Sequence, residues 1–155
     1  MALLQKLLDA IGVDAQLSMP YRFKTKGEML VQCADQSLLT SYACDTTSCG
    51  RFRTYNRTHC GRCVPCMVRK AAIHRWGLSD TTRYKFSALS GAGKTSADDP
   101  MAVACAVLAA EQRGIDFFLG ATLAFASDAD RPHYRRVAEQ GLAELAALLR
   151  RDGVL

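Results

Sequence analysis

Three cysteines lie within seven residues of this chain, in the run Cys60-Gly-Arg-Cys63-Val-Pro-Cys66. Two-residue spacers allow one tight turn to bring successive sulfur atoms onto a single metal ion, and a glycine at position 61 relieves the backbone crowding of that turn. A structural zinc ion takes four ligands in a tetrahedron. The spacing therefore predicts a zinc site with three local ligands and a fourth from elsewhere in the chain.

The residues alone leave the fourth ligand open. Cys49 precedes Cys60 by a loop that is long enough to return to the cluster, and Cys44 is its rival. His59 is a weaker candidate, because the side chains of adjacent residues rarely bind one ion together. The iron–sulfur spacing C-x2-C-x2-C-x3-C-P is the alternative chemistry, but it fails at its last cysteine, where this chain has Lys70.

The chain as a whole has the size and composition of one folded domain. It has 155 residues, 49% of them apolar, and seven cysteines, a pattern that favours metal chemistry in a reducing compartment. No apolar run reaches the ~18 residues of a membrane span, and the N-terminus lacks the features of a signal peptide. We therefore expect a cytoplasmic protein with no membrane partner, in which Cys33 and Cys105 are small buried hydrophobic residues.

Positive charge is concentrated around the cysteines. Residues 51–95 carry ten basic residues and one acidic residue, whereas acidic residues outnumber basic ones on both sides. Such a segment indicates a phosphate-bearing partner such as ATP or nucleic acid, with a solvated surface segment as the alternative. Aromatic residues interleaved with the arginines would suit a single-stranded nucleic acid, namely Phe52, Tyr55 and Trp76.

The first 45 residues have a mixed periodicity. Apolar residues at helical spacing predict a helix over 2–11, and Thr25 with Glu28 forms a capping-box pattern that predicts a helix to about residue 33. Short apolar runs predict strands over 13–19 and 38–43. The order helix, strand, helix, strand is typical of α/β proteins and resembles the end of a larger α/β domain.

The remainder of the chain reads as helices joined by loops. A loop over 44–63 leads to a helix over 64–76, and a small, polar linker over 86–99 separates it from a helical unit over 100–155. In that unit, residues 115–126 are expected to form a buried helix. A Gly-Lys-Thr sequence within residues 88–95 is similar to a phosphate-binding loop but lacks its first glycine, so we read it as linker.

The residues around the cysteines match a known motif. Ser48-Cys49, a loop, and then His59-Cys60-Gly-x-Cys-x-x-Cys-x-x-Arg69 resembles the C-terminal zinc motif of the 7-cyano-7-deazaguanine synthases, the QueC family. Pro20 and the run from Thr25 to Glu28 are similar to the segment that precedes that motif. The Cys-Val-Pro-Cys form and the helical extension look like the QatC-type, QueC-like branch of the Qat anti-phage defence system. The resemblance implies zinc ligation by Cys49, Cys60, Cys63 and Cys66.

The resemblance also implies a fold and a reaction. These enzymes are N-type ATP pyrophosphatases with a Rossmann-like α/β fold, which adenylate a carboxylate and convert it through an amide to a nitrile. Their ATP-binding PP-loop, Ser-Gly-Gly-x-Asp-Ser, does not occur in this chain. We therefore expect residues 1–85 to be the C-terminal part of such a domain, with its zinc knuckle.

The expected function follows from that missing loop. The chain would contribute the zinc-binding lobe of an adenylating ligase and would bind ATP only with an N-terminal PP-loop half. Expected partners are that half or other proteins of the defence system, with a homodimer or nucleic acid as alternatives. No catalytic residue is assigned. Arginines of the basic segment are expected to face ATP phosphates or the target, namely Arg51, Arg53, Arg57 and Arg62.

Overall fold

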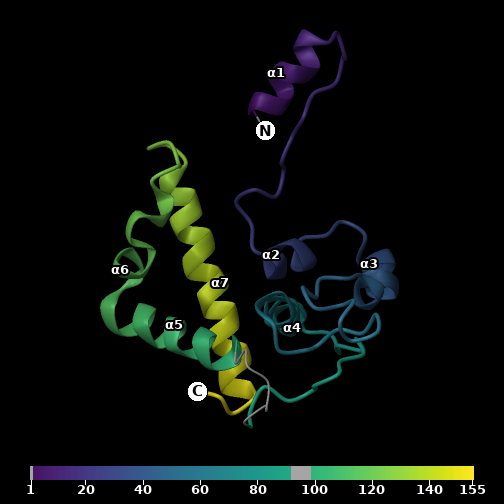
Figure 1. Cartoon of the computed structure of the whole chain (residues 1–155), viewed down its shortest axis with the longest axis vertical. Helices are drawn as coiled ribbons and strands as arrows, with labels where there is room; N and C mark the ends of the chain where they lie inside the picture. Colours follow the sequence, from purple (N-terminus) through teal and green to yellow (C-terminus); the bar gives the residue numbers. More distant parts are fainter. Residues whose placement is uncertain (1, 92–98) are drawn as a thin grey trace.

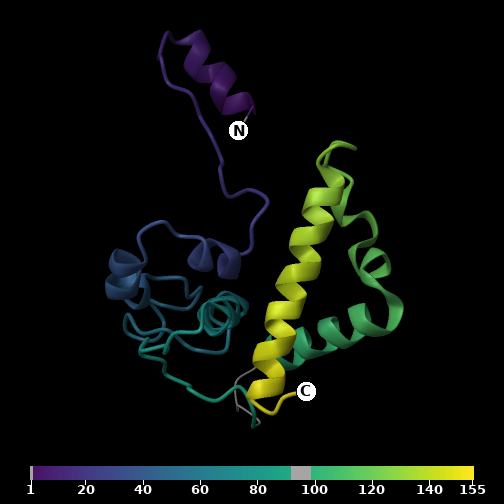
Figure 2. The same cartoon turned by 180° about the vertical axis from the view of Figure 1, so that it is seen from behind.

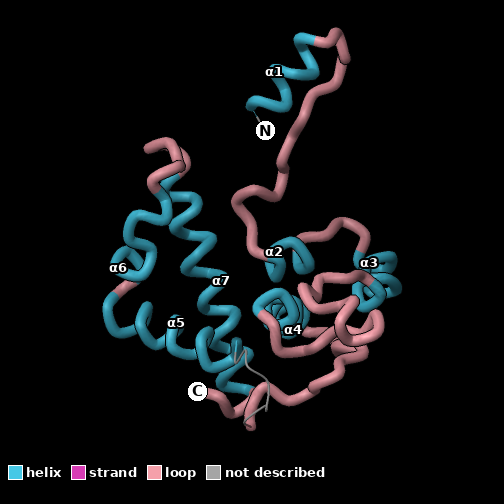
Figure 3. Tube along the Cα trace, viewed as in Figure 1, coloured by secondary structure: helices cyan, strands magenta, loops and turns pink. Residues whose placement is uncertain are grey.

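The computed structural model describes residues 2–91 and 99–155 and is mostly helical (Figure 1). Its elements are α1 (Ala2–Ala10), α2 (Lys26–Val31), α3 (Gln36–Tyr42), the 3₁₀ helix η1 (Ala43–Asp45), α4 (Val64–Trp76), α5 (Asp99–Arg113), α6 (Ile115–Leu119), the 3₁₀ helix η2 (Gly120–Leu123) and α7 (Arg131–Arg151). The described residues contain no sheet, as Figure 3 shows, and only one isolated bridge, between His59 and Tyr84. The predicted Rossmann-like α/β fold is therefore wrong for this part of the chain.

The strand predicted over 13–19 does not form, because it has no neighbouring strand to supply hydrogen bonds. Instead this segment leads away from α1, and the Gln5 side chain binds its backbone, donating to the Ala15 carbonyl at 2.9 Å and accepting from the Leu17 amide at 2.8 Å. Figures 1 and 2 show α1 apart from the other helices in both views. Its apolar residues are consequently exposed, as Leu3 illustrates at 83%.

The second predicted strand, over 38–43, is also wrong, and local side chains explain why. Asp35 caps the start of α3 by accepting a hydrogen bond from the Leu38 amide at 2.8 Å. Within the helix, the hydroxyls of Thr40 and Ser41 donate to carbonyls one turn earlier, at 2.7 and 3.1 Å. An N-cap followed by satisfied hydroxyl groups makes the helix the better local conformation for this apolar run.

Two predicted helices are present close to their predicted bounds: α2 ends two residues before the predicted end, and α4 spans the predicted residues 64–76. The Thr25–Glu28 capping box opens α2, with reciprocal hydrogen bonds of 2.8 and 3.1 Å. Pro65 lies in the first turn of α4, and Gly77 ends it with a left-handed φ of +85°. The helical unit predicted over 100–155 is also present, and its last helix is α7, which runs to Arg151.

The main hydrophobic core lies where α4, α5 and α7 meet. Met67 of α4, Val107 of α5 and Leu148 of α7 are almost completely buried there. Leu89, from the segment that follows the α4 region, is 2% exposed and fills the same core. The α4 helix, which contains Cys66 and is capped by Cys63, is thus fixed to the C-terminal helices by apolar packing.

A polar junction joins α2, α4 and α7 beside this core. The buried Glu144 carboxylate of α7 accepts hydrogen bonds from Arg75, at 2.8 Å, and from the Thr25 hydroxyl. Arg136 of α7 donates to Glu28 at 2.6 Å. Each buried carboxylate is therefore paired, as burial of charge requires.

Residues 115–126 differ from the single buried helix that the sequence predicted. Gly114 and Gly120 take φ of +86° and +46°, so the segment is divided into α6 and η2. The division leaves Phe117 and Phe125 55% and 73% exposed. Cys105 on α5 is exposed as well, contrary to its prediction as a buried residue.

The predicted linker over 86–99 lies only partly within the described residues. Its Gly-Lys-Thr sequence, residues 93–95, lies outside them. The described portion includes Leu89, which is buried in the core and attaches this segment to the rest of the chain. Among the helices of residues 2–91 and 99–155, none combines the length and apolar character that crossing a membrane would need.

Candidate metal centre

The four cysteines predicted to bind zinc converge from two parts of the chain. Cys49 lies in the loop that follows η1, and Cys60 lies at the end of the same loop. Cys63 is the N-cap residue of α4, and Cys66 lies in the first turn of that helix. The start of α4 therefore holds two thiols in place, and the loop returns to bring the other two against them.

The sulfur positions fit one tetrahedral ion. The four Sγ atoms all lie within 4.8 Å of one another, and all four residues are buried. The Sγ atoms of Cys60 and Cys66 are 3.9 Å apart, as are those of Cys49 and Cys63. A tetrahedron with Zn–S bonds of about 2.3 Å has edges of about 3.8 Å. The separations are far longer than the ~2.05 Å of a disulfide bond, and the thiols are free.

Backbone amides point at these sulfurs, as expected for thiolates. The Cys60 and Arg51 amides donate to Cys49 Sγ at 3.2 and 3.3 Å, and the Cys63 amide donates to Cys60 Sγ at 3.2 Å. Burial is the largest single influence on the Cys60 thiol and opposes its ionisation, but hydrogen bonds from Arg62, Cys63 and Cys49 together outweigh burial, so the pKa of that thiol is lowered.

Two other thiols have the opposite shift. Burial raises the pKa of the Cys63 and Cys66 thiols above the ordinary value of 9.0. Four buried sulfurs in mutual contact cannot all be thiolates without a positive charge among them. A divalent cation removes this difficulty, because it deprotonates the thiols that coordinate it. One soft divalent ion would therefore partly balance the negative charge of the four buried thiolates.

The rival fourth ligands lie outside the cluster. Cys44 Sγ is 4.0 Å from an oxygen of Asp80. The buried His59 ring lies beside the cluster, with Nδ1 4.0 Å from Cys66 Sγ, and it contacts Phe52 edge to face. Burial, followed by the nearby Arg69, lowers the pKa of His59. The His59 ring is thus neutral and packs against one side of the cysteine cluster.

Three buried cations surround the centre, and the sequence analysis did not identify their roles. Arg69 donates to the Thr46 hydroxyl at 2.8 Å and to the Ala43 carbonyl at 2.7 Å, and it also contacts Thr82. Lys70, one helical turn after Cys66 on α4, is 5% exposed and donates to the Ser87 carbonyl at 2.8 Å. Four thiolates around one Zn²⁺ carry a net charge of −2, so buried cations at this position stabilise the loaded site.

Arg62 is the third of these cations, and its position overturns the expectation that it faces ATP or a target. It is 7% exposed, and its guanidinium donates to the carbonyls of Ala88, Leu89 and Gly91 at 3.0, 2.9 and 3.3 Å. Arg62 therefore joins the cysteine loop to the segment that enters the core.

Gly61 is required where the cysteine loop meets residues 84–86. It has a φ of +86°, and a Cβ built on it would lie 2.1 Å from the carbonyl oxygen of Phe86. Two backbone hydrogen bonds join these segments. The Lys85 amide donates to the His59 carbonyl at 2.8 Å, and the Phe86 amide donates to the Cys60 carbonyl at 3.1 Å. The motif glycine thus serves two purposes, a left-handed conformation and a close backbone approach.

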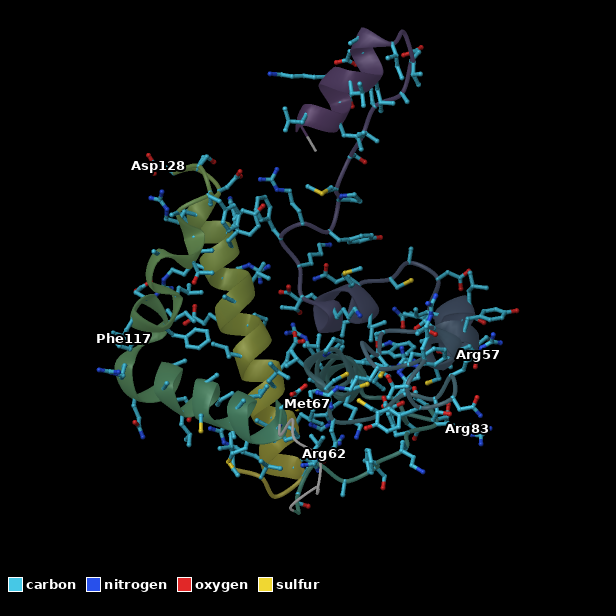
Figure 4. The ribbon with its side chains drawn as sticks, viewed as in Figure 1. Arg57, Arg62, Met67, Arg83, Phe117 and Asp128 are labelled. Carbon is cyan, nitrogen blue, oxygen red and sulfur yellow. The ribbon has the colours of Figure 1, made fainter. Side chains whose placement is uncertain are left out.

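The aromatic residues of the basic segment do not form an open stacking surface. Phe52 and Tyr55 pack against the four cysteines, and the Trp76 indole donates to the Gln36 side chain at 2.8 Å. Unlike these aromatic side chains, Arg57 and Arg83 lie at the outer edge of the part of the chain that holds the cysteines, as Figure 4 shows. The basic surface is therefore present without the aromatic platform that single-strand binding uses.

Comparison with known proteins adds no relative. A scan against protein-family models, a search of curated proteins and a search of solved structures each found no match to this chain.

Proposed function

We propose that this chain is a zinc-binding module in which one Zn²⁺, held by Cys49, Cys60, Cys63 and Cys66, crosslinks the loop before α4 to the start of that helix. The observation that carries the proposal is the closed set of four buried sulfurs with tetrahedral spacing. A set of four cysteines leaves no open coordination position, which is the mark of a structural site. Zinc is favoured over an iron–sulfur cluster because the sulfurs enclose space for one ion.

Metal analysis of the purified chain tests this proposal. We expect one zinc per chain and no visible absorption, because Zn²⁺ is a d¹⁰ ion, whereas an iron–sulfur cluster is coloured. Cys49→Ser should lose the zinc, and Cys44→Ser is the matched control that should retain it. Retention of zinc by Cys49→Ser together with its loss from Cys44→Ser would assign the fourth ligand to Cys44 instead.

The finer proposal concerns the enzyme to which this module belongs. We propose that it is the zinc-binding lobe of a QueC-like adenylating ligase of anti-phage defence, whose PP-loop is supplied by another chain. The support is the resemblance of residues 48–69 to the motif, together with the structural roles of three of its residues. His59 packs beside the cysteines, Gly61 allows the close approach to Phe86, and Arg69 binds Thr46 and Ala43. The helical fold limits the resemblance to the zinc loop and α4.

Pyrophosphate release from ATP tests the finer proposal. The chain alone should release none, and release should begin when a chain carrying Ser-Gly-Gly-x-Asp-Ser from the same operon is added. Cys60→Ser should abolish that gain, since it removes the zinc that fixes the lobe. Pyrophosphate release by the isolated chain would refute the proposal.

A basic surface supports nucleic-acid binding as the second candidate. Four exposed cations of the zinc lobe have no carboxylate within salt-bridge distance among the described residues, namely Arg53, Arg57, Arg83 and Lys85. Phosphate contacts of this kind give affinity that falls steeply with salt. Fluorescence anisotropy with a single-stranded oligonucleotide should then give a salt slope that is about 2 lower for an Arg57→Gln, Arg83→Gln double variant. An affinity that is independent of salt would exclude this candidate.

A further inference from the structure

A cavity that contains none of the four cysteines lies beside the metal centre. It has a volume of about 640 Å³ and is enclosed by the second half of α4, the segment over 78–87 and the end of α7. Cavities of about 300–1,000 Å³ are the usual size for small-molecule sites. Neither the zinc proposal nor the QueC-like motif uses this cavity.

The wall of the cavity includes a buried lysine. Lys70 is 5% exposed, and its ammonium group donates to the Ser87 carbonyl at 2.8 Å and lies 4.4 Å from the centre of the Tyr84 ring. No carboxylate of the described residues is within salt-bridge distance of it. A buried ammonium with one carbonyl and one ring as partners retains donor capacity, since it has three N–H groups.

Further donors line the same cavity. Arg151 comes from the end of α7, His74 from α4 and Ser79 from the segment that follows it. Arg151 adds a second cation to the lining and is itself paired with Asp152 at 2.8 Å. Lys70, which has no carboxylate within salt-bridge distance among the described residues, is therefore the cation that an anionic ligand would pair with. Donors that reach the cavity from three elements suit a phosphate, which has three terminal oxygens, better than a flat carboxylate.

One acceptor completes the wall. Asp80 accepts a hydrogen bond from the Tyr84 hydroxyl at 2.7 Å and from the Thr82 amide at 3.0 Å, one on each carboxylate oxygen. The oxygen that faces the Thr82 amide also has the Cys44 thiol at 4.0 Å, whereas the oxygen bound to Tyr84 keeps a second lone pair for a donor on a ligand. The same carboxylate repels an extended polyanion such as nucleic acid, so the cavity favours a small molecule that has both a phosphate and hydroxyl groups.

We infer that this cavity is a binding site for a small phosphorylated, hydroxyl-bearing molecule, with Lys70 and Arg151 on the phosphate and Asp80 on a hydroxyl group. The inference does not depend on the proposed function. It would stand if the cysteines held a different metal, and zinc content is measured separately from ligand binding.

Calorimetric titration of the metal-loaded full chain with ribose 5-phosphate tests the inference, with neutral ribose as the comparison ligand. Ribose 5-phosphate should give saturable heat and raise the Tm, and ribose should do neither. Lys70→Met should weaken binding by about tenfold or more, because a charge-assisted hydrogen bond is lost. Lys6→Met is the matched control: Lys6 is exposed on α1 and does not line the cavity, so the affinity of this variant should equal that of the wild type.

Lys70 also fixes residues 84–87 to α4, so a second variant that leaves this contact intact is needed. Arg151→Gln gives the second measurement, since the Arg151 side chain is 47% exposed and its loss leaves the core intact. It should bind ribose 5-phosphate several-fold more weakly at unchanged zinc content. Absence of binding to the wild type, or equal binding by the wild type and by every folded variant of Lys70 and Arg151, would overturn the inference.

Discussion

Replacement of Gly61 by alanine tests the contact between the cysteine loop and residues 84–86. The substitution forces a non-glycine residue to a φ of +86°, which costs about 1–2 kcal/mol. It also places a Cβ 2.1 Å from the Phe86 carbonyl oxygen, so the two backbone segments must separate. Separation breaks the hydrogen bonds of Lys85 and Phe86 to the cysteine loop, each worth about 0.5–1.5 kcal/mol. The expected loss in the free energy of unfolding is therefore about 2–5 kcal/mol.

Alanine variants of two other glycines separate the cost of the left-handed backbone conformation from the cost of the close contact with Phe86. Gly77 has a φ of +85° with nothing within 4 Å of its Cβ position, so Gly77→Ala reports the conformational cost alone. Gly50 has open space and no positive φ, so Gly50→Ala should cost little. Urea unfolding of the three zinc-loaded variants measures these differences. If Gly61→Ala costs no more than Gly77→Ala, the close approach to Phe86 is refuted, and with it the reason for a glycine at this position of the motif.

Two further predictions concern the helices around the centre. Hydrogen bonds from Arg136 lower the pKa of Glu28 below 4.5 despite its burial, so its stabilising effect is present above that pH and is lost as the pH falls through the lowered pKa. Glu28→Gln should therefore be less stable than the wild type at pH 7, and the gap in Tm should close in acid; a gap that stays constant to pH 2 would contradict this reasoning. Deletion of residues 2–18 should leave the Tm of the isolated chain unchanged, because α1 stands apart from the core. A large fall in Tm would mean that α1 packs on the body in solution.

Much of the metal centre could be predicted from the sequence, because its spacing is local. Cys60, Cys63 and Cys66 fall on one turn and the helix that follows it, and a turn of that length has few alternative geometries. The start of α2 and the end of α4 could also be predicted from the sequence, because capping residues interact with backbone groups only three or four positions away. The choice of Cys49 over Cys44 came from the motif resemblance, and the structure agrees in bringing Cys49 to the other three sulfurs.

The buried cations and the cavity could not be predicted in this way. Arg62, Arg69 and Lys70 occur in a basic segment that would look the same if it were a solvated surface. Their partners are carbonyls and hydroxyls up to 29 residues away, and nothing in the local pattern indicates them. Only the packing of α4 against α7 and residues 82–91 makes these side chains internal.

The two strand predictions failed for the same physical reason. An apolar run determines that a segment will be drawn to other apolar surface, but a strand also needs a partner for its backbone hydrogen bonds. Residues 38–43 form helical backbone hydrogen bonds in α3, and the backbone of residues 13–19 forms two hydrogen bonds with the Gln5 side chain. The sequence by itself determined the cysteine turn and the helix ends, whose interactions are local. Tertiary structure decided which loops close on that turn, which charges are buried and whether a sheet exists, because each depends on contacts between distant residues.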